Sequence, residues 1–146
     1  MDKKRIEELL ELQRRVDRDR RQDETDVWMH LKMGIGPIKA LFFICNRGTT
    51  NSGKLAEALE VTPTNVSHFI KRLLERDLIT RARDSNDRRV ILLQATLRGE
   101  ELVVNLRQRR KARLTELFNR LTKEEATIVT RALKLMVKVI EADPQA

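Results

Sequence analysis

Apolar residues recur at intervals of three and four along much of this chain, which is typical of helices that bury one face. The first such stretch runs from Asp2 to about Gln22, with an apolar stripe at Ile6, Leu9, Leu10 and Val16. The polar residues Asp23 to Thr25 predict a break after this helix. Val27 to Met33 then reads as a short apolar connector.

The next helix is predicted from Pro37 to Asn46, because proline suits a first turn and Gly48 is a typical stop. It is apolar on most sides, so we expect it to form the buried centre of the fold. Two capped helices follow. Asn51 is the expected N-cap of a helix that ends at Leu59, and Thr62 is the cap of one from Thr62 to about Arg76.

After this helix the spacing of apolar residues changes from the period of a helix to that of a strand. Ile79 to Arg83 and Arg89 to Gln94 are predicted strands, and Asp84 to Asp87 between them is rich in turn formers. Helix, turn, helix and basic hairpin, over Asn51 to Thr96, is the plan of a winged helix-turn-helix. In that plan the second helix enters a major groove, and the hairpin tip touches the neighbouring backbone or minor groove. The predicted fold is mainly α with a small β-hairpin wing.

Two long helices are predicted after the wing. Thr96 caps the first, which runs to about Arg120, and the capping box Thr122 to Glu125 begins the second, which runs to about Ala142. We therefore predict a helical dimerisation region, residues 1–33 and 97–146, around a winged helix-turn-helix region, residues 34–96, in one structural domain. The last helix presents a seam for another helix at Ala126, Val129, Leu133, Met136 and Ile140.

One chain cannot easily bury this seam together with the apolar stripe of the first helix. A two-fold dimer, in which the terminal helices of two chains form one bundle, is the economical solution. Such a homodimer would present its two recognition helices about 34 Å apart, which predicts a pseudo-palindromic operator in double-stranded DNA.

The charge distribution supports a polyanionic partner. The net charge is +8, and Thr62 to Arg113 holds thirteen Lys or Arg against six Asp or Glu. A recognition helix with small hydrogen-bonding residues first and cations later suits base edges and phosphates. On the helices and the wing we expect DNA contacts from Asn51, Thr62, Thr64, Asn65, Ser67, His68, Lys71, Arg72, Arg81, Arg83, Asn86, Asp87, Arg88 and Arg89.

Several sequence motifs resemble those of the MarR-type (multiple antibiotic resistance) winged-helix transcriptional regulators. They are Lys54 to Leu59, Val61 to Ser67, Arg72 to Ile79, Asp84 to Val90 and Thr96 to Glu100. The resemblance covers about Trp28 to Leu102 with specific motifs, and the terminal helices by position and length only. It implies a homodimeric DNA-binding repressor, less often an activator, which in many members is released by a small aromatic or phenolic effector.

The resemblance also implies roles in the wing. The family's Asp-x-Arg motif falls on Asp87 and Arg89, so that Asp87 would orient an arginine, and Arg88 or Arg89 would enter the minor groove. Glu60 and Asp77 depart from the family, whose members often carry glycine there, and Gly34 stands where many have a capping threonine. Because Glu60 tolerates a left-handed turn poorly, we expect a differently shaped loop before the recognition helix.

Trp28, His30 and Phe42 are the candidates for an effector pocket near the dimer junction. Residues of this kind are more often simply core, and an aromatic content of 3% with no tyrosine gives an aromatic-lined site little support. Cys45 lies on an apolar helix without a cationic neighbour, which favours packing over redox sensing.

Other classes of function find no support in the sequence. We find no catalytic nucleophile with a base, no phosphate-binding glycine loop, no metal cluster and no need for a cofactor, so we do not expect an enzyme. No apolar run is long enough to span a membrane and no signal peptide precedes the first helix, so we expect a cytoplasmic protein. Two alternatives stay open: a winged-helix protein–protein adaptor and a sequence-tolerant architectural DNA binder.

Overall fold

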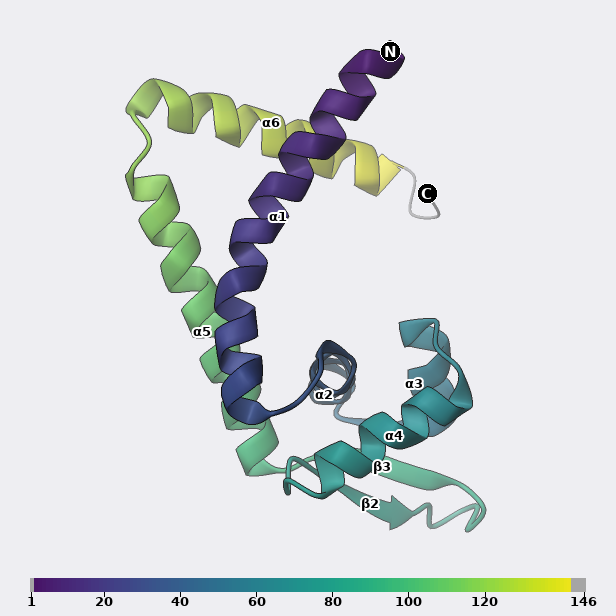
Figure 1. Cartoon of the computed structure of the whole chain (residues 1–146). Coiled ribbons are helices and arrows are strands. Elements are labelled where there is room, and N and C mark those ends of the chain that lie inside the picture. The colour runs from purple at the N-terminus through teal and green to yellow at the C-terminus, as the bar shows by residue number, and fades with distance from the viewer. Residues whose placement is uncertain (1, 143–146) are drawn as a thin grey trace. The chain divides into compact units, whose positions relative to one another are not determined.

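The computed structural model describes the backbone of residues 2–142 and, within it, the side chains of residues 2–17 and 32–142. Its elements confirm a mainly helical fold with a small antiparallel sheet (Figure 1). They are α1 Lys3–Leu31, α2 Ile35–Arg47, β1 Thr49–Asn51, α3 Ser52–Leu59, α4 Pro63–Leu74, β2 Ile79–Arg83, β3 Ile91–Ala95, α5 Leu97–Asn119 and α6 Lys123–Ala142.

The chain folds as two compact units, Met1–Val103 and Val104–Ala146. The first contains the sheet, α1 to α4 and the start of α5. The second contains the rest of α5 together with α6.

The predicted break at Asp23 to Thr25 and the connector at Val27 to Met33 are wrong. The α1 backbone stays helical through both, to Leu31. The segment contains no glycine or proline, and its Arg, Gln, Glu and Asp residues allow the backbone hydrogen bonds to continue after the apolar stripe has ended. The helix ends instead at Leu31, because the next residue, Lys32, has a φ of 46° in the left-handed region. Met33 is then only 4% exposed.

The core lies where α2, α3 and α4 meet the sheet. The prediction that the second helix is the buried centre is confirmed, since five of its residues are buried. One side of α4 adds Val66 and Leu73, and the sheet adds Ile79 and Leu93. Because these apolar faces are buried together, the opposite side of α4 is left exposed.

The sheet has three strands in the order β1-β3-β2, all antiparallel. The short β1 was not expected; it pairs Thr49 with Gln94, and the Gln94 amide donates to the Thr49 hydroxyl at 2.7 Å. The second wing strand begins at Ile91 rather than at Arg89. The reason is a wider turn, in which Asp84 and Val90 are joined by an N–H to carbonyl bond of 3.0 Å.

Two further helix ends, besides that of α1, adopt left-handed backbone without glycine. Glu60 has a φ of 52° and Asp77 of 55°. Glu60 therefore adopts the left-handed turn that its residue type tolerates poorly, and the difference in loop shape from the family stays a prediction. The main chain compensates, because the N–H of Val61 reaches the Ala56 carbonyl and that of Leu78 reaches the Leu73 carbonyl.

Replacing Glu60 with glycine is expected to stabilise the protein by about 1 kcal/mol, because a side chain in the left-handed region is strained. Asp77→Gly should gain less, since aspartate tolerates this conformation better. Glu57→Gly, inside α3, is the control and should cost about 1 kcal/mol. Urea unfolding of the three variants measures this, and a less stable Glu60→Gly would contradict it.

Candidate nucleic-acid interface

The recognition helix α4 begins at the predicted cap. The Thr62 hydroxyl oxygen accepts the N–H of Asn65 at 3.3 Å, and Pro63 occupies the first helical position. Asn51 is likewise the N-cap of α3, because its side-chain oxygen accepts the N–H of Lys54 at 2.9 Å. Both side chains thus have a structural role. Their contact with DNA stays a prediction.

The exposed side of α4 carries the predicted reading face, which we define as Thr64, Asn65, Ser67, His68 and Lys71. Ser67 donates its hydroxyl proton to the Pro63 carbonyl at 3.0 Å and keeps its oxygen as an acceptor. The Lys71 ammonium lies 3.9 Å from the Glu75 carboxylate, and both are exposed. Such a pair contributes little, so Lys71 remains available to a phosphate.

Arg72 takes a different direction from the reading face. One of its guanidinium nitrogens donates to the carbonyl of Lys32 at 3.4 Å, and Arg76 donates to the same oxygen at 3.3 Å. Sequence reasoning missed Arg76. The sequence feature that could have identified Arg76 is its spacing of four residues from Arg72, which places the two guanidiniums one helical turn apart.

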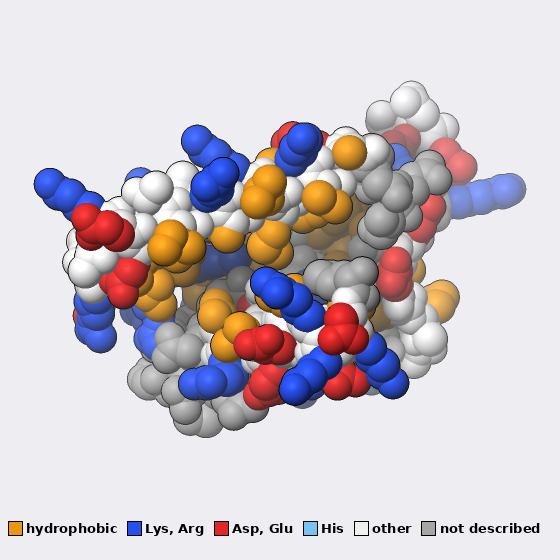
Figure 2. Space-filling view, turned by 90° about the horizontal axis from the view of Figure 1, so that it is seen from above, with side chains coloured by type: hydrophobic (Ala, Val, Ile, Leu, Met, Phe, Trp, Pro, Cys, Tyr) orange, Lys and Arg blue, Asp and Glu red, His pale blue; other side chains and the backbone are white. Residues whose placement is uncertain are grey.

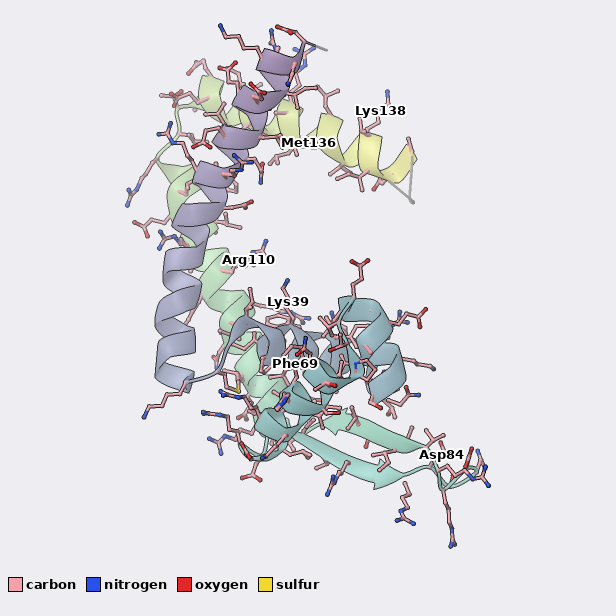
Figure 3. All side chains as sticks on the ribbon, turned by 45° about the vertical axis from the view of Figure 1, so that its right-hand side comes forward. Lys39, Phe69, Asp84, Arg110, Met136 and Lys138 are labelled. Atoms are coloured by element: carbon pink, nitrogen blue, oxygen red, sulfur yellow. The ribbon has the colours of Figure 1, made fainter. Side chains whose placement is uncertain are left out.

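The wing tip is shaped by two aspartates. The Asp84 carboxylate accepts the N–H groups of Asn86 at 2.7 Å and Asp87 at 3.1 Å. These two bonds, that of Asn86 first, hold the pKa of Asp84 below its ordinary value. Figure 3 places Asp84 at the far end of the hairpin. A local carboxylate–amide network therefore fixes this turn.

Asp87 positions an arginine through the main chain. Its carboxylate accepts the backbone N–H of Arg89 at 2.9 Å. Arg81, Arg83, Arg88 and Arg89 are all exposed, and none forms an ion pair with another described residue. Four unpaired guanidiniums at one hairpin are suited to the phosphates of a nucleic acid.

The base of the wing is joined to α5 through Thr96. Its hydroxyl donates to the Asp77 carbonyl at 2.6 Å and accepts the N–H of Gly99 at 3.0 Å, so the predicted cap is confirmed. Its own N–H reaches the Leu78 carbonyl at 3.0 Å. These bonds connect the end of α4, the hairpin and the first turn of α5.

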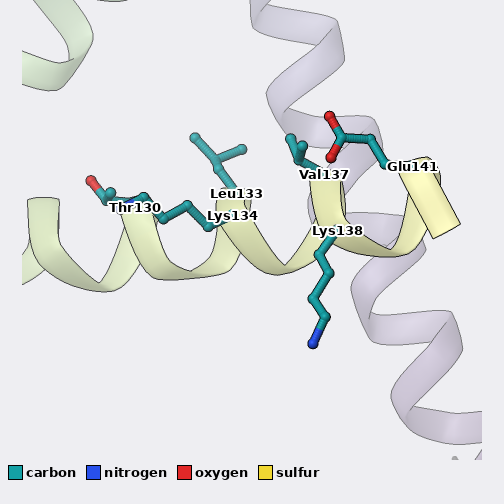
Figure 4. Close-up of a pocket in the computed structure, with 6 residues that line it drawn as sticks. All are labelled: Thr130, Leu133, Lys134, Val137, Lys138 and Glu141. Carbon is teal, nitrogen blue, oxygen red and sulfur yellow. The ribbon is translucent and has the colours of Figure 1, made fainter.

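Of the three candidate effector residues, the structure describes the side chain of Phe42 alone. Phe42 is half-buried on α2, and the side chains of Trp28 and His30 lie outside the described residues. A hollow of about 400 Å³ occurs elsewhere, along α6, and all its lining residues belong to that helix (Figure 4). They are Thr130, Leu133, Lys134, Val137, Lys138 and Glu141.

Within the described ranges, none of the helices combines the length and apolar character needed to cross a bilayer. Those same ranges contain no group of three or more His, Cys, Asp or Glu that could hold a metal ion.

Comparison with known proteins gives consistent matches. A model of the MarR family matches residues 37–91, from the first turn of α2 to the start of β3. The transcriptional repressor MdtR of Bacillus subtilis is 30% identical over 115 residues, which cover 77% of this chain and 74% of MdtR.

Two solved structures share the fold over nearly the whole chain. The transcriptional regulator Tm0710 from Thermotoga maritima has a TM-score of 0.79 at 24% identity, and the alignment covers 96% of this chain and 99% of that one. FabT of Streptococcus pneumoniae, solved in complex with DNA, has a TM-score of 0.71 at 22% identity, with 97% and 99% covered.

Proposed function

This chain belongs to the MarR family of helix-turn-helix transcriptional regulators, and from that premise we propose that it is a homodimeric repressor that binds a pseudo-palindromic operator in double-stranded DNA. The observation that carries the proposal is the exposed reading face of α4 beside a wing whose four arginines have no ion-pair partner among the described residues. The relatives support it, since MdtR is a repressor and FabT has been solved with DNA. A repressor that acts on bacterial DNA would work in the cytoplasm, which is the location that we propose.

In this proposal the reading face supplies the specificity. The side chain of Asn65 makes no hydrogen bond to another described residue, so its amide can donate to and accept from a base edge. Lys71 and His68 would hold phosphates. The wing residues Arg81, Arg83, Asn86, Arg88 and Arg89 would contact the backbone or the minor groove, with Asp87 ordering the turn.

Exposed apolar helices support the dimer. Ile6, Leu9 and Val16 of α1 are 40%, 51% and 61% exposed, and α6 has no buried residue. Figure 2 shows hydrophobic side chains gathered in a row along α6. Apolar surface of this extent on a helix marks a site of association, and a second copy of the chain, through its own terminal helices, is the partner we propose.

The test is selection of bound fragments from a pool of random-sequence duplexes by the purified protein. We expect an enriched motif with two-fold symmetry, and binding that weakens steeply with salt. Equal affinity for enriched and scrambled duplexes would favour an architectural binder. Absence of duplex binding would favour an adaptor that docks an acidic protein. Repeating the selection with phenolic ligands tests whether an effector releases the DNA.

Asn65→Ala is expected to relax the preference for the enriched motif, with a loss of about 1 to 3 kcal/mol on that duplex and little change on a scrambled one. Titration of both duplexes with wild-type and variant protein measures the difference. The control is Thr127→Ala, a change on the exposed surface of α6. An equal loss of affinity on both duplexes would show that Asn65 does not read a base.

A further inference from the structure

Two arginines at the C-terminal end of the recognition helix meet a single carbonyl from a distant part of the chain. The guanidiniums of Arg72 and Arg76 both donate to the Lys32 oxygen, forty and forty-four residues away in sequence. Arg72 is exposed and Arg76 is half-buried. We call this contact the Lys32 clamp.

The acceptor of the clamp is held in place by its surroundings. Lys32 has a left-handed backbone that ends α1, and Met33 next to it is buried in the core. Gly34 then caps α2. The Lys32 carbonyl lies just beyond Leu31, the last residue of α1, where the negative end of the helix dipole favours cationic donors.

The clamp holds α4 at the end opposite to its base-reading residues. Asn65 and Ser67 lie in the first turns, whereas Arg72 is near the last residue and Arg76 just beyond it. Phe69, midway, packs so closely on Gly36 of α2 that a Cβ at Gly36 would overlap its ring. Figure 3 shows Phe69 on α4 beside the helix that carries Lys39. The core contacts one side of α4, and the Lys32 clamp adds a contact at its C-terminal end.

We propose that Arg72 and Arg76 are positioning residues, which set the angle of the recognition helix against the end of α1, rather than phosphate contacts. This inference rests on the proposed DNA-binding function. It assigns Arg72 a role different from that expected from its charge, and it adds Arg76. Through the clamp, a displacement of α1 would move the reading face, so the clamp would couple the two elements.

The test compares Arg76→Gln and Arg72→Gln with Lys71→Gln, a matched control that removes one charge from the same helix. The probes are the duplex enriched by the wild-type protein and its scrambled version. Positioning predicts that each arginine variant loses affinity for the enriched duplex on the order of tenfold, the cost of a misplaced base contact, while the salt slope stays at the wild-type value. Lys71→Gln should weaken both duplexes equally and lower the slope by about one per protomer.

A measurement without DNA separates this inference from the proposed function. Amide hydrogen exchange in the last turn of α1, whose N–H groups are bonded within the helix, should accelerate in Arg76→Gln and not in Lys71→Gln, because only the former loosens the Lys32 clamp. The positioning role would be overturned by any of three results for the arginine variants: a salt slope that falls as in Lys71→Gln, unchanged affinity for the enriched duplex, or unchanged amide exchange in Arg76→Gln. If Arg76→Gln does not fold, Arg76→Lys, which keeps the charge, carries the same readouts. A wild-type protein without preference between the duplexes would instead overturn the proposed function.

Discussion

Arg89→Ala is expected to weaken binding to every duplex, enriched or scrambled, on the order of 100-fold in the dimer, since each of two wings loses a charge-assisted bond of about 1.5 kcal/mol. The slope of log affinity against log salt should fall by about two, because one phosphate contact disappears from each wing. The structural reason is the turn itself. The carboxylate of Asp87 holds the Arg89 N–H at 2.9 Å, so the side chain projects from an ordered backbone.

Titrations of both duplexes at several salt concentrations measure this effect. Arg5→Ala is the matched control, because it removes the same charge from the exposed start of α1. The control should leave the slope close to that of the wild type. Unchanged binding by Arg89→Ala would remove the wing from the interface, and a loss confined to the enriched duplex would mean that Arg89 reads sequence.

Gly99→Ala is expected to destabilise the fold by about 2 to 3 kcal/mol, the cost of overpacking a tight contact. A Cβ on Gly99 would overlap the carbonyl oxygen of Leu78 and lie 3.2 Å from a methyl carbon of Leu41. That oxygen cannot simply withdraw, because it accepts the Thr96 N–H at 3.0 Å and belongs to the residue just before β2. The helix and the hairpin would have to separate.

Thermal and urea unfolding of Gly99→Ala measure the loss, and the melting temperature should fall by about 5 to 10 °C. Gly53→Ala is the matched control. It too lies in the first turn of a helix, but its Cβ would meet only the Asn51 side-chain oxygen at 3.4 Å. The control should be neutral or more stable by up to about 1 kcal/mol, the usual gain from glycine to alanine in a helix. Equal behaviour of the two variants would contradict a close approach at Gly99.

The predictions that succeeded concern structure made by near neighbours. The caps at Asn51, Thr62 and Thr96 each join a side chain to an N–H three residues ahead. The capping box is confirmed in both directions: the Thr122 N–H donates to the Glu125 carboxylate at 2.8 Å, and the Glu125 N–H donates to the Thr122 hydroxyl at 3.2 Å. The bond from the Thr122 N–H is the main cause that holds the pKa of Glu125 below its ordinary value. Residue type alone predicts such bonds, because the partners are brought together by the helix that they begin.

The family resemblance also rests on short sequence motifs, and the match of the MarR family model to residues 37–91 confirms it. These local motifs did not show which charged residues of α4 face outward and which contact another part of the chain. Arg72 and Lys71 are adjacent and both cationic, yet Lys71 lies against Glu75 and Arg72 on the Lys32 carbonyl.

By itself the sequence determined the helices of the reading unit, their caps, the acidic wing turn and the family, because each depends on bonds within a few residues or on a regular apolar period. Tertiary structure alone decided the pairing of β1 with β3, the approach of Gly99 to Leu78 and the gathering of Arg72 and Arg76 on Lys32. These contacts join residues about twenty to forty-five positions apart, and they form only when burial of the shared core offsets the entropy of closing such loops.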